Sequence, residues 1–493
     1  MQRAFAIALG IFCGFAAFAI GWSVTASKPI AGACALAFAA IVAVWCEKSA
    51  SLKLQTDAVP RSYKWLALIA SVLALVQVGR ETIFMVDSTA VGYSNLPSSQ
   101  FELRHSCLSS YFCAAKVVDT QPNIYDESIY ALPSNPNEPR KPRVLDGFKI
   151  DQFEYPPPFL LMPRVLRLIA PEFLPHRALW FGLNLLVIGG AMLFAARSLG
   201  SSAGSRAIIL LPLIFMALPT ISMLQKGNIQ GMVIALAMIA MLCFERGKNA
   251  VGGALLAYTV VSKLFPGLLL FYLLVRKQWN ALAWTAAMGV VYLLLSVADV
   301  GTQPYFAFMK HLPGLVGGEA FPAFRNPAAM AINLSIPGLI FKLKLFDVPG
   351  MGFAAAKLVG WIYTVVAVAM TIVMARRVRT EQEKTVVFLA ILTLATLRSP
   401  FLPTAYAAFP PLWLLTLAGA VMAPTIRTLM GIVLLCLLLN VYSALDLLPP
   451  RSMALLSALP QAVLIGLPIW VFFWLRPAPK LTGNSAALQP TAA

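Results

Sequence analysis

The 493-residue chain has few charged residues, few cysteines and very few histidines. Asp, Glu, Lys and Arg together make up 12% of the sequence, whereas 59% of the residues are hydrophobic. So small a charged fraction cannot cover the surface of a water-soluble globule of this length, and the composition excludes an ordinary soluble domain. The 3 histidines and 7 cysteines form no Cys-His motif with the spacing of a zinc site, and most of the cysteines lie in apolar runs.

Acidic residues are also scarce, and the formal net charge is +18. Such a balance can indicate a nucleic-acid-binding protein. Here the basic residues instead stand in short loops between apolar runs, which is the pattern of cytoplasmic loops in membrane proteins. We therefore expect no nucleic-acid partner.

The apolar runs recur along nearly the whole chain and predict an all-α polytopic membrane protein of about 12–14 transmembrane helices. Short basic loops, such as those at 48–64, 246–248 and 376–384, predict cytoplasmic N- and C-termini. The runs long enough to cross lie at about 4–25, 30–46, 65–86, 177–196, 206–224, 229–245, 279–299, 352–375, 384–400, 404–422, 427–446 and 453–475.

Two apolar stretches do not fit a simple crossing. Residues 250–272 have basic residues on both sides, so we expect two short helices that meet at a turn containing Lys263 and broken by Pro266. Residues 156–170 begin with three prolines and are short, which favours a re-entrant or interfacial segment.

The domain organisation follows from these assignments. Residues 1–64 would form two extra N-terminal spans and a cytoplasmic loop, 65–476 the main membrane domain, and 477–493 a disordered cytoplasmic tail. Two long non-cytoplasmic loops are expected at 87–155, with an amphipathic interfacial helix near 106–118, and at 300–351, with a helix near 333–346. Loops of this length in a compact bundle usually carry function.

Unusual polar motifs collect on the same, non-cytoplasmic face. They are Glu154-Tyr155-Pro156-Pro157, Gly227-Asn228-Ile229-Gln230, Lys263, Asn333-Leu334-Ser335 and Arg398-Ser399-Pro400. Polar groups at membrane depth are costly without a role, so their gathering predicts a site.

In this order the motifs resemble glycosyltransferase family 87, membrane enzymes of the GT-C architecture. The resemblance also includes Tyr111-Phe112-x-Ala114-Ala115 in the first loop, Lys263-x-x-Pro266, and Tyr406 after Ser399-Pro400. It runs from about residue 65 to 474. It implies a GT-C-like bundle and transfer of a mannose-like hexose or a pentose. The compact loops and the lack of organelle signals indicate the plasma (inner) membrane. The donor would be a polyprenyl-phosphate sugar, and the acceptor a lipid or glycan on the extracytoplasmic face.

Such a transfer needs a carboxylate as general base and positive charge for the leaving phosphate. The candidate bases are Asp87, Glu102, Asp151 and Glu154. Where the family usually has an aspartate before the Tyr-aromatic pair, this chain has Cys107, so the resemblance does not identify the base. Nothing in the sequence specifies a cofactor, although the loop carboxylates could hold a divalent cation.

Candidate substrate-binding residues surround these acids. Lys263 and Arg398 could bind the donor phosphate, or could anchor the helices at the membrane interface. The side chains of Asn228, Gln230, Asn333 and Ser335 could bind sugar hydroxyls or cap helices. Tyr155 could stack on a sugar or form a rigid turn. The other candidates are His105 and Tyr406.

Two other hypotheses remain open. A transporter or flippase for a lipid or glycan would need ionisable residues near the bilayer midplane, whereas this chain concentrates its polar groups at one face. A non-catalytic protein with the enzyme fold would also fit the departure at Cys107.

Overall fold

A computed structural model describes residues 1–55, 57, 59–121, 123–133, 138, 140–442 and 448–475. The tail predicted at 477–493 lies outside the described residues. The N-terminal part contains α1 (Gln2–Thr25), α2 (Lys28–Lys48), η1 (Ala50–Leu52) and α3 (Arg61–Val86). The first loop segment, residues 87–155, contains η3 (Val91–Tyr93), α4 (Gln100–Arg104), β1 (His105–Ser106), α5 (Leu108–Val117), η4 (Glu127–Ile129), β2 (Ala131–Leu132), β3 (Lys141–Pro142), β4 (Val144–Leu145) and β5 (Phe148–Ile150). The short helices η5 (Pro157–Leu160) and α6 (Leu161–Ile169) follow it.

The central part contains α7 (Phe173–Ser198), α8 (Ser201–Leu210), α9 (Pro212–Phe215), α10 (Leu218–Gln225), α11 (Gln230–Glu245), α12 (Asn249–Ser262), η6 (Phe265–Gly267), α13 (Leu268–Val275) and α14 (Trp279–Val300). The second loop segment, residues 300–351, contains α15 (Gln303–Gly317), η7 (Pro322–Arg325), α16 (Pro327–Ala331) and α17 (Ile336–Leu345). The C-terminal part contains α18 (Phe353–Arg377), α19 (Glu381–Thr396), α20 (Thr404–Ala407), α21 (Phe409–Val421), α22 (Ile426–Leu439), α23 (Pro450–Leu456) and α24 (Ala458–Trp474).

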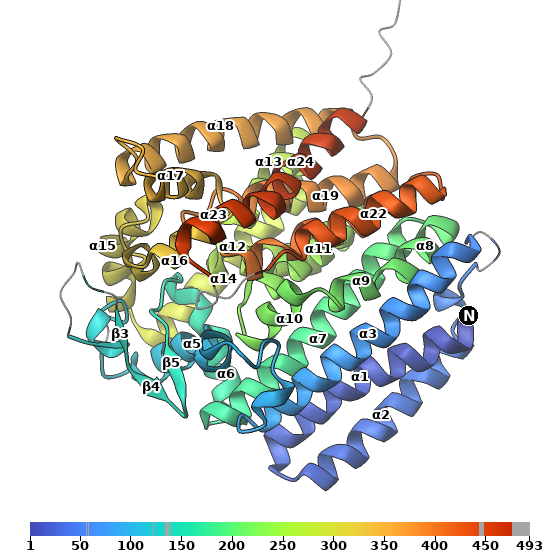
Figure 1. Cartoon of the computed structure of the whole chain (residues 1–493), viewed down its shortest axis with the longest axis horizontal. Helices are drawn as coiled ribbons and strands as arrows, with labels where there is room; N and C mark the ends of the chain where they lie inside the picture. Colours follow the sequence, from blue (N-terminus) through green and yellow to red (C-terminus); the bar gives the residue numbers. More distant parts are fainter. Residues whose placement is uncertain are drawn as a thin grey trace, which may run out of the picture.

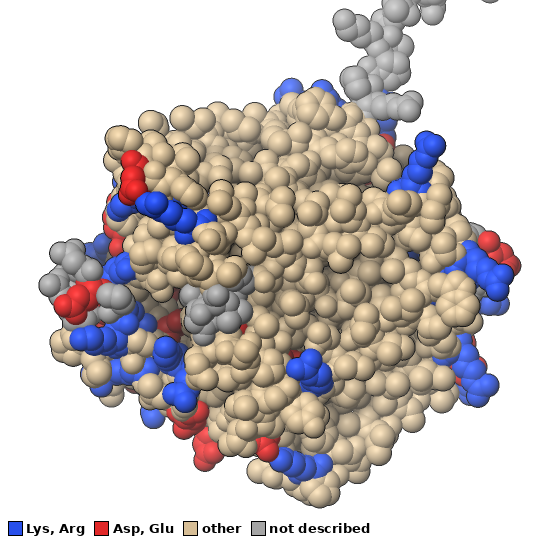
Figure 2. Space-filling view, in the orientation of Figure 1, with Lys and Arg blue, Asp and Glu red and all other residues tan. Residues whose placement is uncertain are grey.

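The chain is an all-α polytopic membrane protein, as predicted. By length and composition, 8 spans in the described residues can cross a membrane, or up to 9 if the bent pair of α8–α9 with α10 is one span. Four shorter apolar helices, α11, α12, η6–α13 and α22, account for most of the other crossings expected from the apolar runs. Figure 2 shows a broad face with few charged side chains between two ends that carry most of the charge visible in this view.

The bundle has its small strands at one end and the N-terminus at the other (Figure 1). Helices α1 and α2 lie where two N-terminal spans were predicted and are long and apolar enough to cross a membrane. Helix α1 packs against α2, α3 and α7. The approach of α1 to α2 requires glycine at Gly10, because an added Cβ would lie 2.6 Å from the carbonyl oxygen of Ala39. Small residues that let backbones approach closely are a common basis of helix packing in membranes.

One predicted span has a different form in the structure. The single span expected at 206–224 is broken between α9 and α10, where the axis bends by 67°. Ala217 is extended there, and it is followed two residues later by Pro219 in the first turn of α10. A residue that leaves the helical region and a proline that lacks a donor together explain the break.

The turn predicted at Lys263 is confirmed. Helix α12 ends at Ser262, Lys263 is extended, and η6 and α13 follow. Pro266 stands in the first turn of η6, where its missing N–H costs no helical hydrogen bond.

The first loop segment is more structured than predicted. Strands β1, β5 and β4 form one small sheet, with β1 and β5 parallel, and β2 and β3 form a hairpin. Helix α5 was predicted to be interfacial, but most of its residues are buried in the core, so that prediction was wrong. The helix that has an exposed apolar face is α6, where the side chain of Leu168 is 86% exposed. Because α6 has only nine residues, it is too short to cross, as expected for 156–170.

The second loop segment also differs from its prediction at the start of its last helix. The helix predicted at 333–346 begins at Ile336, and the hydroxyl of Ser335 caps it by accepting the N–H of Gly338. The helix α15 that precedes it was not predicted.

Candidate functional site

The turn between α10 and α11 holds the first loop segment against the bundle. The carbonyl oxygen of Lys226 accepts hydrogen bonds from the hydroxyl of Ser106 and the N–H of Leu108, each at 3.3 Å. Gly227 follows with a φ of +65°, and a Cβ there would lie 2.9 Å from the Cβ of Leu108. Only glycine tolerates both the dihedral angle and the close approach. The glycine of the Gly-Asn-x-Gln motif therefore allows strand β1 to lie beside the start of α11.

Cys107 stands at the centre of a polar cluster. Its Sγ lies 2.8 Å from the hydroxyl of Tyr406, 3.4 Å from the amide nitrogen of Asn228 and 3.8 Å from Nε2 of His105. On the other side of the imidazole, Nδ1 of His105 lies 3.4 Å from a carboxylate oxygen of Asp151. The fold thus brings together four predicted site residues around Cys107.

The cluster continues along the start of α11 to the broken span. The side-chain oxygen of Asn228 accepts the N–H of Gln230, the first residue of α11, at 2.9 Å. The N-cap position is Ile229, which makes no side-chain cap hydrogen bond, so Asn228 does not cap this helix. The side-chain oxygen of Gln230 accepts a hydrogen bond from the ammonium of Lys263 at 2.8 Å. The same ammonium lies 5.5 Å from the centre of the Tyr155 ring, within the range of a cation–π interaction.

Aromatic side chains hold Tyr155 in place. Its hydroxyl lies 2.8 Å from that of Tyr111, and its ring stacks on Phe159. Its carbonyl oxygen accepts a hydrogen bond from the hydroxyl of Tyr125. Tyr111 in turn packs against Trp180 of α7. The Tyr-Pro-Pro turn is therefore rigid, and one face of the cluster is formed by aromatic rings.

The Glu154 carboxylate is the one candidate base at the cluster that has neither a hydrogen bond nor an ion pair within the described part of the chain. Burial raises the pKa of its carboxyl well above the ordinary range. The negative charge of Asp151 raises this pKa further, and the positive charges of Arg140 and Lys263 lower it. A partly buried carboxylate with a raised pKa and free lone pairs is a strong candidate for a base.

Glu102 lies behind the cluster and is fully committed to a buried network. Its carboxylate pairs with Lys226 at 2.7 Å and accepts hydrogen bonds from the hydroxyls of Ser222 and Tyr442. Burial would raise the pKa of the Glu102 carboxyl, but the ammonium and these hydrogen bonds place it below its ordinary value. Glu102 is 0% exposed, so the acceptor of a sugar could not reach its carboxylate in this structure.

Asp87 is held at the end of α3 by other partners. Its carboxylate pairs with Lys28 of α2 at 3.1 Å and accepts hydrogen bonds from the N–H and hydroxyl of Thr89. These contacts lower the pKa of the Asp87 carboxyl, first through the bond from Thr89 and then through that from Lys28. None of the contacts described for Asp87 joins it to the cluster.

Asn333 and Ser335 act on the cluster through the backbone. The Asn333 side chain donates to the carbonyl of Pro400 at 2.8 Å and accepts the N–H of Leu402 at 2.9 Å. The hydroxyl of Ser335 also bonds to Pro400. Because residues 400–403 lead into α20, these two side chains fix the helix that carries the tyrosine of the cluster.

Arg398 lies against α18. Its Nε donates to the hydroxyl of Thr364 at 2.7 Å, and its guanidinium lies over the ring of Trp361. Among the contacts of the described residues, none connects Arg398 to Lys263 or to the carboxylates.

Sequence reasoning missed several residues that build the site. Lys226 directly precedes the Gly-Asn-x-Gln motif, so its position was a signal, but its buried partner Glu102 is 124 residues away. Arg325 forms a two-fold hydrogen bond to Glu127 at 3.1 and 3.2 Å, which joins the two loop segments. The meeting of His105, Cys107 and Asp151 was also missed, because sequence spacing alone indicated no metal-ligand cluster.

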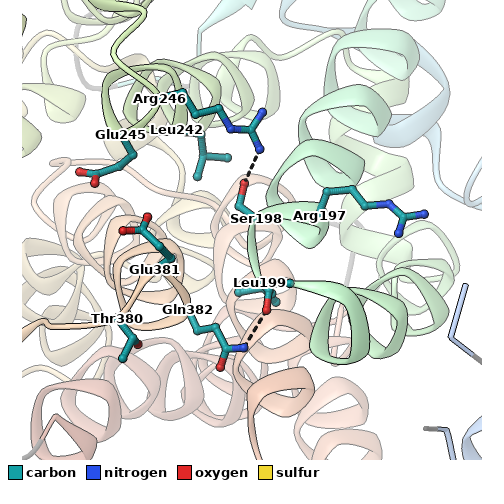
Figure 3. Close-up of a pocket in the computed structure, with 10 residues that line it drawn as sticks. Arg197, Ser198, Leu199, Leu242, Glu245, Arg246, Thr380, Glu381 and Gln382 are labelled. Carbon is teal, nitrogen blue, oxygen red and sulfur yellow. Dashed lines mark hydrogen bonds between the residues drawn. The ribbon is translucent and has the colours of Figure 1, made fainter. Parts of the chain in front are cut away.

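A cavity of about 660 Å³ lies at the opposite ends of α7 and α11 from the cluster. Figure 3 shows its lining side chains, with Arg246 bonded to Ser198 and Gln382 to the carbonyl of Leu199. No predicted site residue lines it. The lining residues are Arg197, Ser198, Leu199, Gly200, Leu242, Glu245, Arg246, Thr380, Glu381 and Gln382.

A family model described as glycosyltransferase family 87 matches residues 153–400, which is half of the chain. The matched region begins just before Glu154 and includes Asn228, Gln230 and Lys263, whereas Cys107 and Tyr406 lie outside it. No curated protein and no solved structure matches the chain.

Proposed function

The chain belongs to glycosyltransferase family 87 and is thus a membrane glycosyltransferase, and from this premise we propose its donor, acceptor and catalytic groups. The donor is a polyprenyl-phosphate sugar carrying a mannose-like hexose or a pentose. The acceptor is a hydroxyl group of a lipid or glycan at the extracytoplasmic face of the plasma (inner) membrane. The single observation that supports this most is that a cation, carboxylates, amides and aromatic rings gather where the two loop segments meet one end of an apolar bundle.

Glu154 is the general base in this proposal. The acceptor oxygen attacks the anomeric carbon, its proton passes to the Glu154 carboxylate, and the bond from the anomeric carbon to the phosphate oxygen breaks. The absence of any hydrogen bond or ion pair to this carboxylate among the described residues supports the assignment, as does its raised pKa. Glu102 and Asp87 are left out because each is already paired with a lysine.

Lys263 binds the phosphate of the donor and stabilises it as it leaves. Its ammonium has three donor hydrogens, and one of them is used by Gln230. The others are free to bond phosphate oxygens, and a lysine binds phosphate as a compact point charge. The extended backbone at Lys263, between two short helices, presents the side chain toward the cluster rather than along a continuous helix.

The sugar lies between the aromatic face and the amides. The Tyr155 ring offers a stacking surface, while the amides of Asn228 and Gln230 and the hydroxyl of Tyr406 offer hydrogen bonds beside it. Their geometry is fixed through the hydrogen bond from the N–H of Gln230 to the Asn228 side chain and through the bonds that hold residues 400–403. Pre-set groups of this kind lower the cost of orienting the substrate.

The membrane side of the cluster follows from the distribution of basic loops. With the loops at 246–248 and 376–384 in the cytoplasm, both loop segments lie outside. A lipid-phosphate donor fits that side, because nucleotide sugars are supplied in the cytoplasm. The resemblance further implies inversion at the anomeric carbon.

The test uses full-length protein purified in lipid with a panel of polyprenyl-phosphate sugars and, separately, nucleotide sugars. Membrane extract serves as the acceptor, and release of polyprenyl phosphate is measured for wild type, Glu154→Gln and Glu102→Gln at matched folded concentrations. We expect extract-dependent release from one lipid donor, loss of this release in Glu154→Gln and its retention per folded molecule in Glu102→Gln. Transfer from a nucleotide sugar, or full activity in Glu154→Gln, would refute the proposal. Movement of intact lipid donor across the bilayer without release would favour the flippase hypothesis.

A further inference from the structure

Three different metal-binding groups meet at the centre of the cluster. One donor atom from each of His105, Cys107 and Asp151 lies within 4.8 Å of the other two. The thiol and Nε2 of the imidazole are 3.8 Å apart, and Nδ1 and the carboxylate are 3.4 Å apart. No other group of this kind occurs among the residues that the structure describes.

The backbone holds these donors in register. In the parallel pairing of β1 with β5, His105 lies opposite Lys149, so the residues just after each strand are neighbours. The hydroxyl of Ser109 accepts the N–H of Asp151 at 3.1 Å and lies 3.2 Å from the carbonyl oxygen of Lys149. Asp151 therefore directly follows a strand that is paired with the one carrying the imidazole, and its backbone is held beside Ser109.

We propose that His105, Cys107 and Asp151 bind one thiophilic divalent cation of the zinc class. A thiolate, an imidazole and a carboxylate are the donor types that zinc takes from proteins, and the thiolate disfavours magnesium and calcium. In a tetrahedral site with bonds of about 2.3 Å to sulfur and 2.0–2.1 Å to nitrogen, the two donors lie about 3.5 Å apart. The observed 3.8 Å between Sγ and Nε2 needs only a small closure.

The carboxylate has further to move than the thiol. Nε2 of the imidazole faces the thiol and Nδ1 faces Asp151, so the carboxylate swings toward the metal side of the ring when all three donors bind. Its side chain is 32% exposed, so solvent leaves room for this motion. On binding, the Cys107 thiol loses its proton to water as the bond from sulfur to the metal forms, with no change of oxidation state.

Three protein ligands leave a fourth position for an oxygen of the substrate. That position lies beside the Asn228 amide and the Tyr406 hydroxyl, which already approach Sγ. A metal there would polarise a phosphate or hydroxyl oxygen, which would assign a function to Cys107. This last step rests on the proposed function, whereas metal binding itself does not.

The test measures binding of Co²⁺ alone to full-length protein that has been treated with a chelator under reducing conditions. We expect one equivalent to bind with a thiolate-to-cobalt charge-transfer band in the near ultraviolet, and Zn²⁺ to abolish the band. Cys107→Ser removes the band and Asp151→Asn weakens binding at least tenfold. Cys113 carries a thiol six residues away, outside the cluster. The control Cys113→Ser leaves the charge-transfer band and the cobalt affinity unchanged.

A second measurement needs no variant. Zn²⁺ should slow labelling of Cys107 by a small, membrane-permeant thiol reagent, read by mass spectrometry. Labelling of Cys34, which lies on the exposed face of the span α2, should stay unchanged. Absence of the band together with unprotected Cys107 overturns the proposal, as does cobalt binding that is equal in wild type and Cys107→Ser. Because neither measurement uses activity, a failed transferase assay and a failed metal site are distinguishable.

Discussion

Replacing Lys263 with methionine removes the cation that we assign to the donor phosphate and keeps most of the side chain's length. The chain offers an unusually close control. Lys342 of α17 bonds the side-chain oxygen of Gln461 at 2.8 Å, just as Lys263 bonds that of Gln230 at 2.8 Å. Both substitutions leave a glutamine oxygen without its lysine partner, but only one removes a cation from the cluster.

The magnitude follows from the contact that is lost. A hydrogen bond to a charged group contributes about 1.5–3 kcal/mol, and about 1.4 kcal/mol corresponds to a factor of ten. Loss of the phosphate contact should therefore lower kcat/KM about 10- to 150-fold in Lys263→Met. The structural cost of an unpaired amide oxygen is common to both variants, so Lys342→Met reports it separately.

The assay compares kcat/KM for the lipid donor with the thermal unfolding midpoint of each variant in the same detergent. We expect both variants to unfold at similar temperatures and only Lys263→Met to lose activity. If Lys263→Met keeps activity within about threefold of wild type, or if Lys342→Met loses as much, the phosphate role is refuted.

Three further changes test other parts of the structure. Glu154→Gln should lower the rate about 10²- to 10⁴-fold. The pKa of the Glu154 carboxyl is raised and the base must be ionised, so wild-type kcat/KM should rise with pH in a range above the pKa of an ordinary glutamate. A rise of kcat/KM centred near pH 4 would contradict this. Glu102→Gln leaves the buried ammonium of Lys226 unpaired and should destabilise the fold by about 3–5 kcal/mol, measured by chemical or thermal unfolding. An unchanged unfolding midpoint would show that the ion pair does not contribute to stability. Gly253→Ala places a methyl group 2.6 Å from a side chain of α14 and should cost about 1–3 kcal/mol, whereas Gly289→Ala, which meets nothing within 4 Å, should not lower the midpoint.

The membrane class, the family and the broken span could be predicted from the sequence because each depends on local information. Apolar runs and basic loops predict spans directly, and Pro266 with basic residues on both sides predicts the turn at Lys263. The place of Asn228 and Gln230 at the start of α11 was also accessible, because the motif stands immediately before an apolar run.

The composition of the site depended on distant contacts. Cys107 meets Tyr406 across 299 residues, and Glu102 meets Lys226 across 124 residues. Neither pairing leaves a periodic signal, so Glu102 looked as available as Glu154 although it is fully buried. The strands β1 and β5 have only two and three residues, so no alternation of apolar and polar residues could predict them. Their pairing nevertheless places Asp151 beside His105.

Single-turnover transfer of a labelled sugar tests the central claim, that the cluster between the loop segments and the bundle is the catalytic site. Wild type, Glu154→Gln and Asp87→Asn would be loaded with the lipid donor that supports release and mixed with membrane extract. The account predicts labelled product from wild type and Asp87→Asn, and none from folded Glu154→Gln over the same time. Equal product from Glu154→Gln and wild type, or loss confined to Asp87→Asn, would contradict it.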